Sequence, residues 1–131
     1  MTRILITGAS GMIGQALLGL LGNTDHDIIA TDLHAPELPE NARFEPMDVT
    51  GPDPQRVILR SRPDVIVHLA SIVTPPAGSG RDLAYAVDVT GTRNVLQAAC
   101  AANVRRLVVT SSGAAYGYHP DNPVPLRETD P

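Results

Sequence analysis

The feature that most constrains the fold is a glycine-rich turn between a short apolar run and a helical pattern. Residues 7–14 read Thr-Gly-Ala-Ser-Gly-Met-Ile-Gly, after an apolar run from Arg3 to Thr7 and before a helical pattern from Met12 to Leu21. Glycines at a strand-to-helix turn let an anion reach the backbone N–H groups at the helix start, where the helix dipole favours negative charge. The pattern therefore predicts a strand, a phosphate-binding turn and a helix.

The three glycines of this turn have separate expected roles. Gly8 allows the tight turn, Gly11 allows the phosphates of a dinucleotide to approach, and Gly14 allows the helix to pack closely on the strand. Their spacing is GxxGxxG rather than GxGxxG, so the triplet alone is weak evidence. The cofactor contacts expected from the turn and the helix start are Gly8, Ser10, Gly11, Met12, Ile13 and Gly14.

An acidic residue at the end of the next predicted strand identifies the nucleotide more closely. Asp32 follows the apolar run Ile28 to Thr31 and lies 18 positions after Gly14. A carboxylate there accepts hydrogen bonds from the adenosine ribose hydroxyls and repels a 2′-phosphate. The next residues, Leu33 and His34, include no arginine that would favour a phosphate. NAD is therefore expected rather than NADP, the alternative being a glycine turn with an unrelated surface aspartate.

The rest of the chain alternates apolar runs with helical patterns. Each apolar run is hydrophobic throughout instead of at every second residue, which is typical of parallel strands covered on both faces. The pattern predicts an α/β, doubly wound parallel sheet, a Rossmann fold with helices on both faces that is truncated after its fifth strand. Residues 1–131 are expected to form one domain with a loop or tail over 113–131. Further strands are expected at 43–47, 64–69 and 106–110, and helices at 54–61 and 81–102.

Composition argues against several other classes of protein. The chain is 43% hydrophobic and 18% charged with a net charge of −4, and it has no basic stripe, so we expect no nucleic-acid partner. The apolar run at the N-terminus is too short for a signal peptide or a membrane span, which predicts a cytoplasmic protein without a membrane partner. No metal site is expected. The single cysteine, Cys100, lies in an alanine-rich helical stretch and is expected to be buried.

Five segments, taken in order, resemble the extended short-chain dehydrogenase/reductase family, which includes sugar-nucleotide epimerases and dehydratases. The turn resembles its TGxxGxxG, and Asp48-Val49 resembles the acidic-hydrophobic pair that holds adenine in that family. The other three are His68-Leu69-Ala70-Ser71, similar to HLAA; Asp88-Val89-Thr90-Gly91-Thr92 with Asn94-Val95-Leu96, similar to NVxGTxNVL; and Thr110-Ser111-Ser112 with Tyr116-Gly117, similar to SSxxxYG. The resemblance covers essentially the whole chain.

The resemblance implies roles for residues beyond the turn. Ser112 would hydrogen-bond the reacting oxygen, with Ser111 as its rival and a capping hydroxyl as the alternative. Asp88 stands where the family usually has asparagine, and its charge leaves the cofactor contacts there open. His68 lies inside a predicted apolar strand, so on that ground it is expected to be a core histidine bonded to backbone rather than an acid or base. The further cofactor contacts expected are Leu33, Asp48, Val49, Leu69, Ala70, Ser71, Asp88 and Thr110.

The family also implies a Tyr-x-x-x-Lys pair, which this sequence does not contain. All ten basic residues are arginine, Tyr116 is followed four positions later by Pro120, and Tyr118 is followed by Asn122. Without a nearby cation a tyrosine keeps a pKa near ~10 and is a poor base at neutral pH. The chain alone is therefore expected to be inactive.

Two interpretations follow from that absence. The first is the NAD-binding part of a longer NAD-dependent epimerase, dehydratase or dehydrogenase, with its substrate domain absent. Such an enzyme would act by hydride transfer on a nucleotide sugar or related alcohol and form a homodimer through the 81–102 helix. The second is a non-catalytic NAD-sensing or regulatory module.

Overall fold

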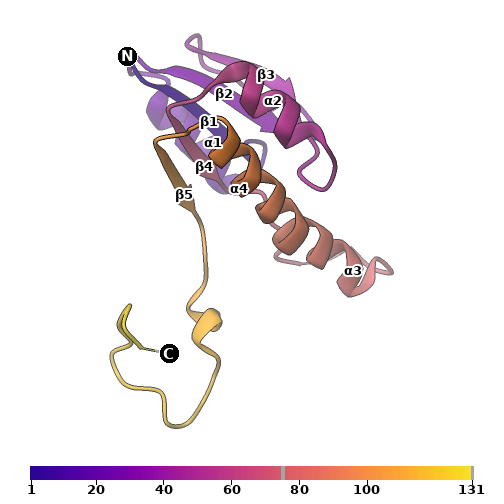
Figure 1. Cartoon of the computed structure of the whole chain (residues 1–131), viewed down its shortest axis with the longest axis vertical. Helices are drawn as coiled ribbons and strands as arrows, with labels where there is room; N and C mark the ends of the chain where they lie inside the picture. Colours follow the sequence, from indigo (N-terminus) through magenta and orange to yellow (C-terminus); the bar gives the residue numbers. More distant parts are fainter. Residues whose placement is uncertain (75, 131) are drawn as a thin grey trace.

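Five parallel strands form a single sheet in the computed structural model, which describes residues 1–74 and 76–130 (Figure 1). The strand order is β3-β2-β1-β4-β5, with β1 (Arg3–Thr7) in the centre. On one side lie β2 (Asp27–Asp32) and β3 (Ala42–Pro46), and on the other lie β4 (Val65–His68) and β5 (Arg106–Val109). The order reverses beside β1, and open α/β sheets bind ligands at the carboxyl ends of the strands at such a point.

Helices cover both faces of this sheet. Helix α1 (Met12–Leu21) packs through Leu18 on one face, whereas α2 (Asp53–Ser61) and α4 (Thr92–Ala101) cover the other, as Figure 1 shows. The first face has a small core that includes Ile4, Ile6, Ala9, Leu18, Ile28 and Ala30. The second face has a larger core formed by Leu5, Ile29, Met47, Val49, Val57, Ile58, Ile66, Val95, Ala98 and Ala99. The predicted doubly wound α/β fold is confirmed.

The helix expected over residues 81–102 is present but is not a uniform α-helix. It begins with α3 (Gly80–Tyr85), passes through a π-helical segment η1 (Ala86–Gly91) and continues as α4. Its first part projects beyond the sheet (Figure 1). Wide turns of this kind occur often at functional sites.

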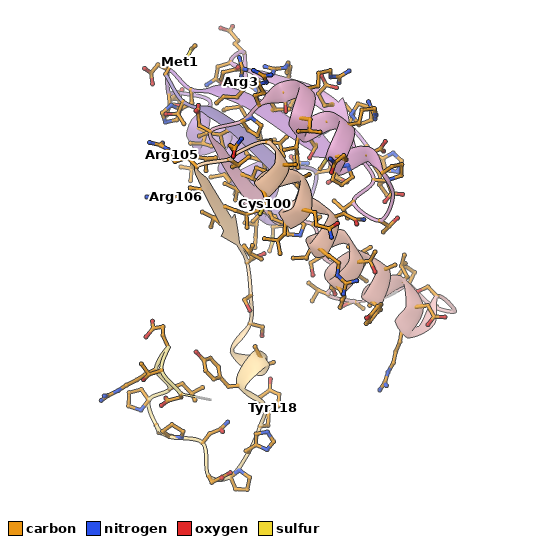
Figure 2. The ribbon with its side chains drawn as sticks, in the orientation of Figure 1. Met1, Arg3, Cys100, Arg105, Arg106 and Tyr118 are labelled. Atoms are coloured by element: carbon orange, nitrogen blue, oxygen red, sulfur yellow. The ribbon has the colours of Figure 1, made fainter. Side chains whose placement is uncertain are left out.

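The expectation that Cys100 is buried is wrong. Cys100, labelled in Figure 2, is exposed on α4. The buried positions of this helix are Val95, Ala98 and Ala99, which share one face at helical spacing. Cys100 is one further residue along, about 100° around the helix from Ala99, and so faces solvent.

The chain after β5 leaves the sheet and forms a tail (Figure 1). This tail contains one short 3₁₀ helix, η2 (Gly113–Tyr116), and otherwise consists of turns and irregular backbone up to residue 130. Tyr118, labelled in Figure 2, is 91% exposed. Pro131, the last residue of the expected tail, lies outside the described residues.

At the amino ends of the strands, an aspartate joins β1, β2 and β3. Asp27 accepts a hydrogen bond from Arg3 Nε at 2.6 Å and one from Arg43 Nη1 at 2.5 Å. The Arg3 backbone N–H donates to Asp64 Oδ2 at 2.8 Å. Burial raises the pKa of Asp27, but the two arginine hydrogen bonds together outweigh it and lower that pKa below its usual value. This clamp lies opposite the edge where the predicted site residues lie.

Candidate nucleotide-binding site

The carboxyl ends of β1, β2 and β4 and the segment after β3 surround a hollow of about 200 Å³, which we call the first recess. It brings together nine of the residues predicted to contact the cofactor, from four separate segments of the chain. These are Gly8, Gly11, Asp32, Leu33, Asp48, Val49, Leu69, Ala70 and Ser71. Thr7, Thr31, Met47, Ile72 and Val87 complete its lining.

The glycine turn is built so closely that side chains would not fit at two of its positions. A Cβ on Gly8 would lie 2.7 Å from the Ala70 nitrogen, and Gly8 also has a φ of +68°, where L side chains are strained. A Cβ on Gly14 would lie 2.4 Å from the Gly8 oxygen. Gly14 thus allows α1 to pack against the turn itself.

Gly11 has a different environment, because it faces the recess. A Cβ there would meet only the Gly8 oxygen, at 3.3 Å. Gly11 is the N-cap of α1 and provides no side-chain cap, and the first turn of that helix contains no acidic residue among the described ones. Backbone N–H groups at this helix start are therefore accessible to an anion, so the residues present fit a dinucleotide pyrophosphate.

Asp32 is half-buried, lines the first recess and is held in place by the glycine turn. Its Oδ2 accepts the Ser10 N–H at 2.9 Å, and its Oδ1 accepts the Leu33 N–H at 2.7 Å. The Ser10 hydroxyl donates to the His34 backbone oxygen, which ties the turn to the loop after β2. Each carboxylate oxygen keeps acceptor capacity for a further donor.

Asp48 lies two residues after the end of β3 and lines the first recess. Its Oδ1 accepts hydrogen bonds from the N–H and the hydroxyl of Thr50, at 2.9 and 2.7 Å, and it orders a tight local turn. The Asn94 side chain of α4 donates to the backbone oxygens of Val49 at 2.8 Å and Gly51 at 3.3 Å. The motif that resembles NVxGTxNVL thus braces the Asp48-Val49 segment.

A second recess, of about 410 Å³, adjoins the first and shares Leu69, Ala70 and Ser71 with it. It contains the predicted site residues Ile13, Asp88, Thr110 and Ser112, together with the rival Ser111. One oxygen of Asp88 accepts the Ile72 N–H at 3.0 Å. His68, Val73, Thr92 and Val109 form the remainder of its lining.

His68 is buried, as expected, but its partners are hydroxyls and not the backbone. Its Nδ1 lies 2.7 Å from Thr7 Oγ1, and its Nε2 lies 2.9 Å from Thr92 Oγ1. Thr7 Oγ1 already accepts the N–H groups of Leu69 and Ala70, both at 3.1 Å, so its single hydrogen is donated to Nδ1. The imidazole is therefore neutral and carries its proton on Nε2.

The electrostatics of His68 agree with this assignment. Burial of the imidazole lowers the pKa of His68, and the nearby carboxylate of Asp88 opposes that change with a smaller effect. With both ring nitrogens engaged in hydrogen bonds, His68 ties the end of β4 to Thr7 at the end of β1 and to Thr92 of α4.

Ser112 lies in the second recess and also caps the 3₁₀ helix η2. Its Oγ accepts the Ala114 N–H at 3.2 Å, which is the capping role named above as the alternative. The hydroxyl hydrogen is still available for donation. Ser111 lines the same recess, so the structure brings both serines to the same part of the site.

Three predicted cofactor contacts lie outside both recesses. Met12 is 87% exposed, Gly14 is buried against the turn, and Ser10 holds Asp32 through its N–H. Sequence reasoning did not include Thr7 and Thr92 among the site residues. Thr7 belongs to the quoted turn and ends β1, so its place at a strand end was the available signal.

Residues 1–74 and 76–130 contain neither a metal-binding cluster nor a membrane-spanning helix. In these residues no group of three or more metal-binding side chains lies close enough together to hold an ion. No helix formed by them is both long and apolar enough to span a membrane.

Comparison with known proteins places this site in a family. The model of the NAD dependent epimerase/dehydratase family matches residues 4–131. The chain belongs to this family. A curated relative, the UDP-glucose 4-epimerase of Mycolicibacterium smegmatis, is 33% identical over 92% of this chain and 42% of its own length. The expected family and its NAD dependence are thereby confirmed.

Solved structures agree with this membership. WbmH of Bordetella bronchiseptica, solved in complex with NAD+, superimposes with a TM-score of 0.87 at 25% identity, over 100% of this chain and 45% of that one. WbmG of the same organism, solved with NAD and UDP, has a TM-score of 0.82 at 27% identity and covers 99% of this chain and 43% of its own. The chain thus spans less than half the length of the relatives it matches.

Proposed function

We propose that the two adjoining recesses bind NAD, with adenosine in the first and nicotinamide in the second. The observation that carries this assignment is the hydrogen bond from the Ser10 N–H of the glycine turn to the Asp32 carboxylate. This hydrogen bond supports the proposal because it holds a carboxylate that could accept ribose hydroxyls beside the glycine turn, whose N–H groups would contact the pyrophosphate. Gly8, Gly11, Leu69, Ala70 and Ser71 would line the path between the two ends. The family membership and the NAD-bound relatives support this reading.

The carboxylate of Asp32 makes the site selective for NAD over NADP. Ribose hydroxyls donate to it, whereas a 2′-phosphate meets a like charge. Hydrogen bonds to a charged acceptor contribute about 1.5–3 kcal/mol, so losing them weakens binding roughly 10- to 100-fold.

Calorimetric titration of the chain with NAD+ and NADP+ tests this proposal. Asp32→Ala should weaken the binding of NAD+ roughly 10- to 100-fold, and Asp32→Asn should reduce the preference for NAD+ over NADP+. Asp25→Asn is the matched control, since Asp25 is exposed and precedes the same strand at the opposite edge of the sheet. Unchanged NAD+ affinity in Asp32→Ala contradicts the ribose assignment.

We further propose that the whole protein oxidises and reduces an alcohol of a nucleotide sugar or related compound. Bound NAD supplies the hydride acceptor, and Ser112 or Ser111 donates a hydrogen bond to the reacting oxygen. Support comes from the epimerase relative and from a structural relative that was solved with UDP.

The base for this reaction is the part that these residues do not supply. The sequence has no lysine to lower the pKa of a tyrosine, so we propose that the 131 residues bind NAD without turnover. A Tyr-x-x-x-Lys pair encoded after Pro131 is the expected source. A reading frame that continues without such a pair, combined with stoichiometric NAD binding and no turnover, would favour the NAD-sensing alternative.

We also propose that the whole protein pairs through α4. Leu96 is 44% exposed on this helix and lines a shallow groove between α4 and β5. Ala99, Cys100, Asn103, Val104 and Leu107 form the rest of its lining. Leu96→Arg should shift the sedimentation of the protein toward the monomer. Leu20→Arg, an exposed position on α1 across the sheet, should leave it unchanged. Equal effects of both substitutions would contradict this interface.

A further inference from the structure

Asp88 is the one negatively charged side chain in the lining of the second recess among the described residues. The other lining residues are apolar or hydroxyl-bearing, apart from His68, which is neutral. Oδ1 of Asp88 is oriented by the Ile72 N–H at 3.0 Å. Within residues 1–74 and 76–130, none of the ion pairs includes this carboxylate. Its negative charge is therefore not compensated by a neighbouring cation.

The position of Asp88 on its helix fixes where this charge acts. It lies within the π-helical segment η1, and Thr92, four residues later, lines the same recess beneath it. The Thr92 hydroxyl is held by His68 Nε2 at 2.9 Å, which joins this part of the helix to the end of β4. Asp88 is thus held in the half of the site that contains Ser111 and Ser112, away from Asp32.

We propose that Asp88 makes this site selective for the oxidised form of the cofactor. The inference rests on the proposed function, which puts nicotinamide in the second recess. The nicotinamide ring is a cation in NAD+ and neutral in NADH, whereas the pyrophosphate and adenosine are the same in both. A carboxylate in the wall of this recess stabilises the cation and has no comparable effect on the neutral ring.

The redox-state comparison separates this effect from any repulsion of the pyrophosphate. Repulsion between Asp88 and the pyrophosphate weakens the binding of NAD+ and NADH by the same factor and leaves the ratio of their dissociation constants unchanged. Attraction between Asp88 and the cationic ring strengthens the binding of NAD+ only, and so changes that ratio. For a charge on the wall of a solvent-open recess, a Coulomb interaction amounts to about a three- to tenfold change.

The test measures Kd for NAD+ and NADH by calorimetry at low salt, on the chain and on Asp88→Asn. The amide has the shape of the carboxylate and still accepts the Ile72 N–H, so only the charge is removed. We expect the ratio of Kd(NADH) to Kd(NAD+) to fall about three- to tenfold in Asp88→Asn. Added salt should lower the ratio of the unmodified chain toward that of the variant.

Asp82→Asn is the matched control, because Asp82 is exposed on the projecting helix α3 and lines neither recess. The ratio of Kd(NADH) to Kd(NAD+) in Asp82→Asn should equal that of the unmodified chain. If both forms bind and the ratio is the same in Asp88→Asn, the inference is overturned while the proposed function stands. If the unmodified chain binds neither form, the proposed function fails and the inference fails with it.

Discussion

Replacing Gly8 by alanine tests whether the turn after β1 needs a bare backbone for packing as well as for conformation. Two costs add at this position. The φ of +68° is strained for an L side chain, which costs about 1–2 kcal/mol. The new Cβ would lie 2.7–2.9 Å from backbone atoms of Leu69 and Ala70, and forcing a group into packed surroundings costs about 1–3 kcal/mol more.

Gly78 provides the control that separates these two costs. Its φ is +84°, yet a Cβ there would meet nothing within 4 Å. Gly78→Ala should therefore lower the free energy of unfolding by about 1–2 kcal/mol, and Gly8→Ala by about 2–5 kcal/mol. Urea unfolding followed by circular dichroism measures both, since the chain has no tryptophan for fluorescence. A loss in Gly8→Ala no larger than in Gly78→Ala would refute the packing argument.

Three further predictions concern stability. The pKa of His68 is lowered in the folded chain, so the unfolded chain binds an extra proton and the free energy of unfolding should fall as the pH drops below 6.5. His68→Gln should remove this contribution, as measured by thermal melting at a series of pH values. Gly91→Ala would place a Cβ 2.7 Å from Val49 Cγ2 and should destabilise by about 1–3 kcal/mol, with Val49→Ala rescuing part of the loss in a double-mutant cycle. Asp27→Asn should cost about 1 kcal/mol by urea unfolding, and Arg43→Gln should cost less because one arginine partner remains; the opposite order would contradict the clamp.

The sheet and the first recess could be predicted from sequence because local signals agree with one another there. The strand at Arg3–Thr7 and the helix at Met12–Leu21 have the bounds expected from hydrophobic pattern and glycine position. Asp32 was placed by its distance from Gly14, and in a parallel sheet that spacing returns it to the same edge as the turn.

Other features depend on contacts that no local pattern records. Thr7 and His68 are 61 residues apart, so neither segment alone could show that His68 bonds to a hydroxyl instead of to the backbone. The π-helical segment at Ala86–Gly91 is only six residues long, too short for its wider turn to leave a distinct period in the sequence. Cys100 was misplaced because an alanine-rich helix gives little contrast between its two faces.

The wall shared by the two recesses has a thermodynamic consequence for any ligand made of two linked halves. Leu69, Ala70 and Ser71 line both recesses, and the Thr7 hydroxyl fastens the first two by their N–H groups. The protein itself therefore fixes the common segment before any ligand arrives, so neither half of the ligand has to order it. Mononucleotide fragments that occupy the two recesses should therefore bind without positive cooperativity, each with the same Kd whether or not the other is present.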